Sequence, residues 1–235
     1  MKLAATVLIP THDHCQLLNY SIPSVLSQTV RDIEIFIIGD GVPEGTRKIV
    51  ADFMKQDERI KFFDFPKGAR LGEAYRHEII LQHAQGEIIC YHSDDDLMMP
   101  HHVAILQHAL KNADFAHTLP VLVLADNSLE ILPVDLGIAD FHNMVLTEIN
   151  RIPLSNAAHT LQFYRSLPYG WRTTPVGAAT DHYMWQQILS QPTCRAVTIP
   201  QPSVIGFPSS HRRDWTIADR LKELNNWQKA WQIIL

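Results

Sequence analysis

The sequence has little cysteine, no excess of positive charge and no long apolar run. Its three cysteines form no CxxC pair, so we expect neither a disulfide framework nor a cysteine-based zinc site. The net charge of −5, from 20 basic and 25 acidic residues, argues against a nucleic-acid binder. The opening MKLAATVLIPTHDH has only about seven apolar positions before polar ones, too few for a signal peptide or a membrane span. We therefore expect a soluble cytoplasmic protein.

Several functional motifs are also missing. The 13 histidines are scattered and form no HExxH pair. The segment KGARLG (67–72) lacks the GK[ST] ending of a phosphate-binding Walker A loop. No repeat, low-complexity segment or linker divides the chain. We therefore predict a single domain over 1–235, with a ligand-binding first half (1–112) and a second half (113–235) that ends in a helix.

Apolar runs and helical patterns alternate over the first ~110 residues, which indicates βαβ units and a mostly parallel sheet. The expected strands are 3–9, 33–40, 59–65 and 87–93. The expected helices are 16–29, 44–56, 71–86, with Gly86 as C-cap, and 100–112. In the second half we expect a hairpin with Asp126-Asn127 at its turn. A short helix near 156–167 and helices over 181–190 and 215–235 are expected to follow.

Polar clusters follow the predicted strands: PTHDH after the first, GDGVPEG after the second and SDDD after the fourth. Parallel sheets bind ligands outside the carboxyl ends of their strands. We therefore expect a ligand site where these clusters meet.

Asp94, Asp95 and Asp96 stand in a row after an apolar strand, within YHSDDDLMMP (91–100). Such carboxylates can bind a hard divalent cation or accept hydrogen bonds from sugar hydroxyls. They can also simply form a solvated loop that caps the next helix. The residues alone leave these three interpretations open.

The pattern VLIPTHDH…SIPSVLSQT…IEIFIIGDG…AQGEIICYHSDDDLMMP resembles the opening of family 2 glycosyltransferases. That family has the GT-A fold, a Rossmann-like, mostly parallel central sheet flanked by helices. The resemblance covers residues 4–110 and, more weakly, Asp181. It implies an enzyme that transfers a sugar from a nucleotide-diphosphate sugar to an acceptor hydroxyl with inversion. UDP is the expected nucleotide.

The resemblance also implies roles for individual residues. Those expected to contact the donor are Pro10, Thr11, His12, Asp40, Arg70, Arg76 and Asp94. Those expected to hold or support Mn²⁺ or Mg²⁺ are Asp95, Asp96 and His211. His211 lies in SSHRRDW (209–215), which could equally be a basic segment that precedes the terminal helix.

Asp181, in GAATDHYMW, matches the carboxylate that takes the acceptor proton in inverting members of the family. The alternative is that Thr180 or Asp181 caps a helix.

The second half is the expected acceptor side, for a glycan, a lipid-linked intermediate or a small molecule. Aromatic and basic residues of 155–175 could stack on sugar rings or hold phosphate, or they could form a packed loop. They are His159, Tyr164, Arg165, Tyr169, Trp171 and Arg172. Trp227 and Trp231 could support a homodimer or contact with a membrane surface, although core packing also explains them.

Some positions depart from the family pattern: His12-Asp13 replaces an aromatic-Asn pair, Gly39 replaces an acid, and Ser93 replaces another. Two other functions therefore stay open. One is a sugar nucleotidyltransferase, although PTHDH lacks the glycine-rich loop typical of that class. The other is a non-catalytic nucleotide- or glycan-binding module of the same fold.

Overall fold

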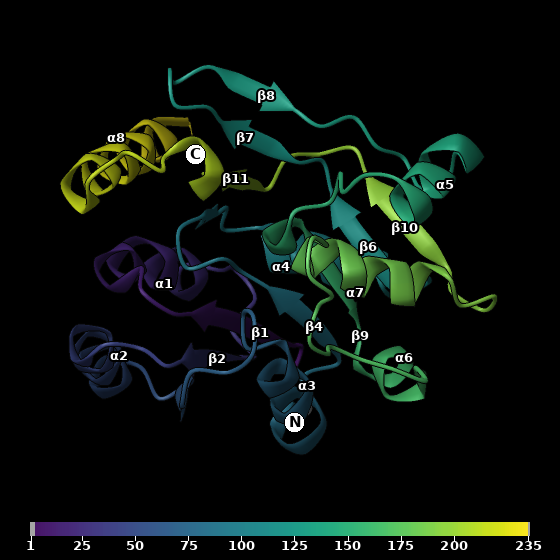
Figure 1. The fold of residues 1–235 in the computed structure, drawn as a ribbon, viewed down its shortest axis with the longest axis horizontal. Helices are drawn as coiled ribbons and strands as arrows, with labels where there is room; N and C mark the ends of the chain where they lie inside the picture. The colour runs from purple at the N-terminus through teal and green to yellow at the C-terminus, as the bar shows by residue number, and fades with distance from the viewer. Residues whose placement is uncertain (1–2, 235) are drawn as a thin grey trace.

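The computed structural model describes residues 3–234, and of residues 231–234 only the helical backbone. Seven strands form a main sheet in the order β10-β6-β9-β4-β1-β2-β3 (Figure 1). They are β1 (Ala5–Thr11), β2 (Ile33–Asp40), β3 (Ile60–Phe65), β4 (Ile88–Tyr91), β6 (Phe115–Thr118), β9 (Ala157–Thr160) and β10 (Ala196–Ile199). Paired neighbours run parallel, except that β9 is antiparallel to β4 and β6. The second half thus completes the sheet that the first half begins.

Helices cover both faces of this sheet. The α-helices are α1 (Leu18–Leu26), α2 (Glu44–Gln56), α3 (Glu73–His83), α4 (His102–Ala109), α5 (Ala139–Thr147), α6 (Leu161–Ser166), α7 (Thr180–Leu189) and α8 (Ile217–Ile234). Short 3-10 turns are η1 (Cys15–Leu17), η2 (Leu154–Asn156) and η3 (Ser209–His211).

Both faces of β1 are buried, which explains why its sequence is a continuous apolar run. On one face Val7 packs in a cluster with residues of α1, α2 and α4, such as Ile22 and Leu106. On the other face Leu8 packs in a cluster with residues of α3, α5, α6 and α7, such as Trp185. The strand is therefore fixed at the centre of two cores.

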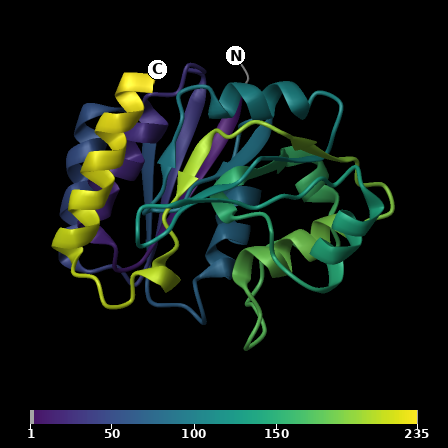
Figure 2. The same cartoon turned by 90° about the horizontal axis from the view of Figure 1, so that it is seen from above.

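A second sheet has the order β5-β11-β7-β8. Its strands are β5 (Leu97–Met98), β7 (Val121–Val123), β8 (Leu129–Ile131) and β11 (Val204–Gly206). A third apolar cluster joins this sheet to α8 through Leu97, Phe207 and Leu224, and Figure 2 shows α8 lying alongside α1. The segment with the three aspartates therefore connects the main sheet to the small one.

The predicted elements of the first 112 residues are all present, with ends that shift by a few residues. The predicted hairpin is β7 and β8, and Asn127 at its turn has φ 65°, a conformation that asparagine tolerates. The residues Ala157 and Ala158, predicted as helix, are instead buried in β9 between β4 and β6. Sheet pairing here overrides the helix preference of alanine.

The terminal helix begins at Ile217, two residues after the predicted start. Trp227 is partly buried against the third apolar cluster, whereas the side chain of Trp231 lies outside the described residues. Within residues 3–234, no helix combines the length and the apolar character that a membrane crossing requires.

Gly86 does not cap α3, which ends at His83. Instead its backbone lies against β1, where its N–H donates to Thr6 Oγ1 at 3.0 Å. A Cβ at this position would lie 2.2 Å from the Thr6 nitrogen. Close approach of two backbones, rather than a helix end, therefore explains this glycine.

Gly86→Ala should lower the free energy of unfolding by about 3 kcal/mol, because the clash is with backbone that cannot rotate away. Urea unfolding at neutral pH measures this change. Gly137→Ala is the matched control, since its Cβ would meet only the Asp135 side chain, at 3.2 Å. Equal stability of the two variants would contradict the assignment.

Three buried histidines are hydrogen-bonded to hydroxyl groups. Burial lowers the pKa of His102 to about 3, and the pKa values of His117 and His159 to about 4. His159 Nδ1 donates to the Thr160 carbonyl, so its Nε2 accepts from the Tyr91 hydroxyl at 2.6 Å. Protonation would break this arrangement.

Stability should therefore fall as the pH drops from about 6.5, the ordinary histidine pKa, towards 4. In this window the unfolded chain takes up protons that the folded chain excludes, which costs on the order of 1 kcal/mol per histidine and pH unit. Midpoints of urea unfolding at pH 7.5 and pH 5 measure how steeply stability depends on pH. His117→Asn should flatten this dependence, whereas the exposed His108→Asn should not. A midpoint that stays constant over this range would refute the prediction.

Candidate active site

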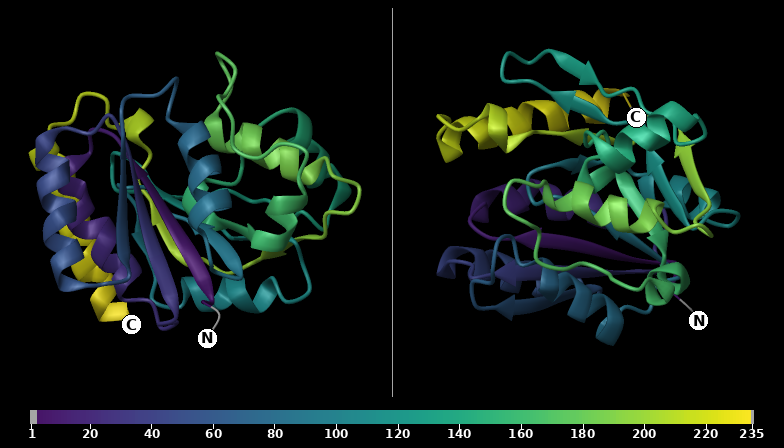
Figure 3. Two further views of the ribbon diagram at one scale, coloured as in Figure 1. Left: turned by 90° about the horizontal axis from the view of Figure 1, so that it is seen from below. Right: turned by 45° about the vertical axis from the view of Figure 1, so that its right-hand side comes forward.

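A cleft of about 420 Å³ lies at the carboxyl ends of β1, β2 and β4. Its lining includes Pro10, Thr11, His12, Asp13, His14, Ile38, Asp40, Leu71, Gly72, Arg76, Ser93, Asp94, Asp95, Leu154 and Ser209. Figure 3 (left) shows the loops before α3, α7 and α8 projecting beyond this end of the sheet. The parallel register of β1 and β4 aligns their ends, so the clusters predicted to meet do meet.

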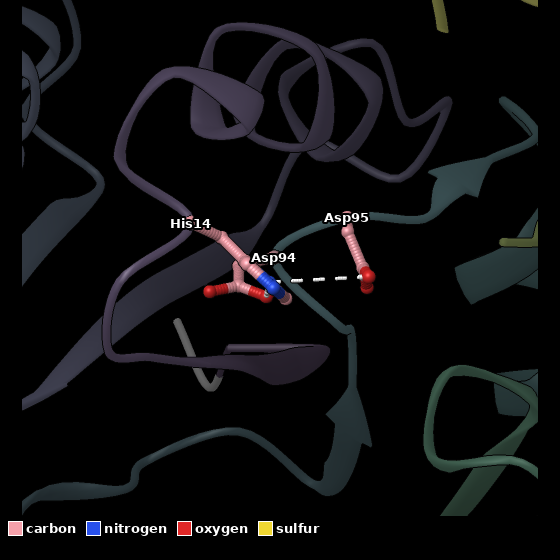
Figure 4. A group of neighbouring side chains, drawn as sticks. All are labelled: His14, Asp94 and Asp95. Atoms are coloured by element: carbon pink, nitrogen blue, oxygen red, sulfur yellow. Dashed lines mark hydrogen bonds and ion pairs between the residues drawn. The ribbon is translucent and has the colours of Figure 1, made fainter. Parts of the chain in front are cut away.

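Asp94 is held by two donors, one from the last residue of β1 and one from the turn that follows it. Thr11 Oγ1 donates to Asp94 Oδ2 at 2.6 Å, and His14 Nδ1 lies 2.8 Å from Asp94 Oδ1. Figure 4 shows the His14 ring reaching towards both Asp94 and Asp95. Both oxygens of Asp94 thus have a partner.

Asp95 is held from the other end of the chain. Its Oδ2 accepts from Arg220 Nη2 at 2.7 Å and from Ser209 Oγ at 2.7 Å. The same oxygen lies 3.9 Å from His14 Nδ1. The two carboxylates are therefore neutralised by different cations.

His14 is the cation beside Asp94. Burial alone would lower the pKa of His14, but the hydrogen bond to Asp94 and the charges of Asp94 and Asp95 outweigh it. Together they raise this pKa to about 9. His14 is consequently protonated at neutral pH in this arrangement.

Asp96 does not join its two neighbours. Its Oδ2 accepts from Ser155 Oγ at 2.5 Å and its Oδ1 from the Phe207 N–H at 2.9 Å. Burial, followed by the charge of Asp95, raises the pKa of Asp96 to about 7. Both oxygens of Asp96 thus tie the loop to η2 and to the end of β11, and its expected support of a metal ion stays a prediction.

Asp40 ends β2 at the cleft. Its carboxylate accepts from Lys67 Nζ at 2.5 Å and from the Gly68 N–H at 2.6 Å, and its carbonyl accepts from His12 Nδ1 at 2.6 Å. Gly72, with φ +66°, leaves room for this carboxylate, since a Cβ there would lie 2.9 Å from Asp40 Cγ. The loop 67–72 is thus folded around Asp40.

Arg76 forms a buried wall of the cleft. Its guanidinium lies 4.8 Å above the Trp171 ring, and Trp171 Nε1 donates to the Tyr91 hydroxyl at 2.8 Å. Burial lowers the pKa of Arg76, opposed by the charges of Glu73, Tyr91, Asp181 and Asp40, in that order. Among the described residues, its Nε has no hydrogen-bond partner. Because Arg76 lines the cleft, its guanidinium supplies positive charge to an anion bound there.

Arg70, the alternative expectation, does not line the cleft. It adopts φ 57° in the loop before α3, and its guanidinium reaches the Ala178 carbonyl at 3.4 Å. Its contact is with the loop before α7. The structure therefore favours Arg76 over Arg70 as the basic residue of the cleft.

Asp181 lies in the first turn of α7, where its Oδ1 accepts from the His182 N–H at 2.9 Å. Burial raises its pKa, while this backbone bond and the charge of Arg76 lower it. Asp181 is not among the residues that line the cleft. Its charge acts on the pKa of Arg76, which does line the cleft.

His211 is exposed in η3 and is not part of the His14, Asp94 and Asp95 cluster. Its expected metal role stays a prediction. Of the SSHRRDW segment, Ser209 is the residue that lines the cleft.

The predicted acceptor residues divide into two groups. His159, Tyr164 and Trp171 are buried in the core, so they are unavailable to an acceptor. Tyr169 is 58% exposed, and the Arg172 guanidinium lies 4.3 Å above its ring.

The sequence interpretation missed His14 and Arg220. His14 stands in the PTHDH cluster, so its position after β1 was a usable signal. No signal in the sequence marks Arg220, because its partner Asp95 lies 125 residues away in the chain.

The cluster of His14, Asp94 and Asp95 fits a divalent cation. One ligand atom from each residue lies within 4.8 Å of the others, and oxygen with imidazole nitrogen suits Mn²⁺. His14 would have to lose its proton to serve as a ligand.

The glycosyl transferase family 2 profile matches residues 6–159, more than half of the chain. The chain belongs to glycosyl transferase family 2. It is 29% identical over 112 residues to the GalNAc(5)-diNAcBac-PP-undecaprenol beta-1,3-glucosyltransferase of Campylobacter jejuni, covering 48% of this chain and 36% of that relative. An uncharacterized glycosyltransferase of Haemophilus influenzae is 30% identical over 93 residues, which cover 40% of this chain and 36% of that relative. The match thus spans about 36% of these relatives' length.

Two solved structures share the fold of this family 2 chain. S. aureus TarS 1-349 in complex with UDP-GlcNAc superposes with a TM-score of 0.69 at 12% identity, covering 88% of this chain and 59% of TarS. The mannosyltransferase PcManGT from Pyrobaculum calidifontis, in complex with GDP-Man and Mn²⁺, superposes with a TM-score of 0.61 at 17% identity. The superposition covers 87% of this chain and 57% of PcManGT. These likenesses confirm the predicted GT-A fold.

Proposed function

We propose that this chain transfers a sugar from a nucleotide-diphosphate sugar, UDP by default, to an acceptor hydroxyl with inversion and with the help of a divalent cation. One observation carries the proposal. The cleft joins the His14, Asp94 and Asp95 cluster to the guanidinium of Arg76 at the carboxyl ends of the strands of a GT-A sheet.

The cleft offers the donor two kinds of contact. The segment Pro10–His12 and the Asp40 end of β2 form one wall, suited to a flat base, and Arg76 offers a buried cation to the phosphates. The relatives of known structure were solved with UDP-GlcNAc and with GDP-Man, which supports a nucleotide-sugar donor without selecting the base.

His14, Asp94 and Asp95 would hold Mn²⁺ or Mg²⁺. The cation would supply positive charge where negative charge develops on the leaving diphosphate. Arg76 contributes fixed positive charge from the opposite wall.

Asp181 is the proposed base. The acceptor oxygen forms a bond to the anomeric carbon, its proton passes to the Asp181 carboxylate, and the bond from that carbon to the diphosphate oxygen breaks. Burial raises the pKa of Asp181, which makes its carboxylate a stronger base. Its interaction with Arg76 supports an orientation towards the donor.

The acceptor is proposed to approach past the loop 167–179, which carries exposed Tyr169 and Arg172. An aromatic face beside a guanidinium suits a sugar or a phosphate-linked glycan. The name of the Campylobacter relative includes a PP-undecaprenol acceptor, which supports a glycan or lipid-linked partner.

A non-catalytic module of the same fold is the second candidate, favoured by the departures at Gly39 and Ser93 and by the location of Asp181 outside the cleft lining. Such a module would bind the nucleotide but would not depend on Asp181 for any reaction.

Asp181→Asn should reduce sugar transfer and donor hydrolysis by about 10²-fold or more, because the acceptor proton loses its base. Calorimetric affinity for UDP should stay unchanged. Asp140→Asn, also in the first turn of a helix but exposed, is the matched control. Unchanged turnover in Asp181→Asn would exclude the base role, and binding without turnover in the unmodified protein would favour the non-catalytic module.

Asp95→Asn should abolish the extra thermal stabilisation that Mn²⁺ adds to UDP, since a ligand stabilises only the state that binds it. Asp96→Asn should keep that increment, because Asp96 faces Ser155 and Phe207 instead. A thermal-shift screen of nucleoside diphosphates with Mn²⁺ or EDTA measures both variants. The same screen identifies the preferred nucleotide base. Loss of the increment in Asp96→Asn but not in Asp95→Asn would reverse the assignment.

A further inference from the structure

Arg220 occupies the oxygen of Asp95 that a metal ion would use. It lies in the first turn of α8 and is 6% exposed. Its Nη2 donates to Asp95 Oδ2 at 2.7 Å and its Nη1 to Ser209 Oγ at 3.1 Å. Ser209 Oγ in turn donates to Asp95 Oδ2 at 2.7 Å. Two donors thus converge on one carboxylate oxygen.

That oxygen also faces the rest of the cluster. Asp95 Oδ2 lies 3.9 Å from His14 Nδ1, so a cation held among His14, Asp94 and Asp95 would lie close to this oxygen. The cation would then meet a guanidinium within a few ångströms, and like charges at that range in a buried site repel strongly.

The second buried arginine of this region has a different partner. Arg212 pairs with Glu223 through two bonds of 2.7 Å and donates to the Val123 carbonyl at 2.9 Å. This pair fixes α8 without touching the aspartates. The Arg212–Glu223 pair therefore continues to anchor α8 when the Arg220 contact is broken.

Arg220 is also incompletely satisfied where it lies. Among the described residues, its Nε has no hydrogen-bond partner, and its bond to the Phe207 carbonyl is long at 3.4 Å. A buried donor without a partner is costly, which lowers the free energy needed to release Arg220 from Asp95.

We propose that Arg220 is a built-in competitor of the divalent cation at Asp95, and that the cation binds by displacing it. The inference rests on the proposed metal site and adds a residue that sets its affinity. A bound diphosphate offers the displaced guanidinium a new anionic partner. Cation and nucleotide diphosphate should therefore bind with positive coupling that depends on Arg220.

The test is calorimetric titration of Mn²⁺ alone into the unmodified protein and into Arg220→Gln. Removal of the competing charge should tighten Mn²⁺ binding about tenfold or more. Added UDP should strengthen Mn²⁺ binding in the unmodified protein and much less in Arg220→Gln. Arg220→Lys, which keeps the charge, and the exposed Arg213→Gln should resemble the unmodified protein.

Unchanged or weaker Mn²⁺ binding in Arg220→Gln would overturn the inference and leave the metal site standing, with Arg220 orienting Asp95. Absence of Mn²⁺ binding in both proteins would overturn the inference together with the metal part of the proposed function. Sugar transfer in EDTA then tests the remaining part separately.

Hydrogen exchange on the unmodified protein covers the case in which Arg220→Gln does not fold. Mn²⁺ should speed amide exchange at the start of α8, around residues 217–222, because the Arg220 contact is released. Slower or unchanged exchange there would overturn the proposal.

Discussion

The carboxylates of Asp94 and Asp95 must lie side by side at the carboxyl ends of the central strands, largely out of water. The rest of the structure depends on this constraint. Like charges repel and burial penalises both. Thr11 and His14 satisfy one carboxylate, and Ser209 and Arg220 satisfy the other. These partners come from β1, the turn after it, η3 and α8. Segments from the early and the late part of the sequence therefore meet at the Asp94-Asp95 pair.

Three consecutive aspartates have three different environments because the backbone turns between two sheets at this point. β4 ends at Tyr91 in the main sheet, and β5 begins at Leu97 in the small one. Asp96 stabilises the junction by accepting from Ser155 and from the Phe207 backbone. The small sheet and α8 thus hold the turn in the shape that presents Asp94 and Asp95 to the cleft.

The sequence was sufficient to locate Asp40 and Asp94, because each follows an apolar strand whose end is visible in the pattern. It was also sufficient for the parallel half of the sheet, where local periodicity and burial agree. It was insufficient for β9, where alanine favours a helix but sheet pairing prevails. It was insufficient for Arg220 as well, because nothing local marks a side chain whose partner is 125 residues away. The sequence could not show that Asp96 turns towards Ser155 and the Phe207 backbone, because adjacency in sequence says nothing about which way each carboxylate turns.

The departures from the family pattern and the geometry of the cleft both concern the residues expected to contact the nucleotide base. Both oxygens of Asp40 are engaged, by Lys67 and by the Gly68 N–H, and Gly39 supplies no second acid. A base that bonds to Asp40 must therefore displace Lys67 or share an oxygen with the loop 67–72. His12 stands where the pattern has an aromatic residue, and its ring is held on the Asp40 carbonyl at 2.6 Å. His12, Asp40 and Lys67 thus form one hydrogen-bonded unit, and under the proposed function a nucleotide base that contacts Asp40 has to open it.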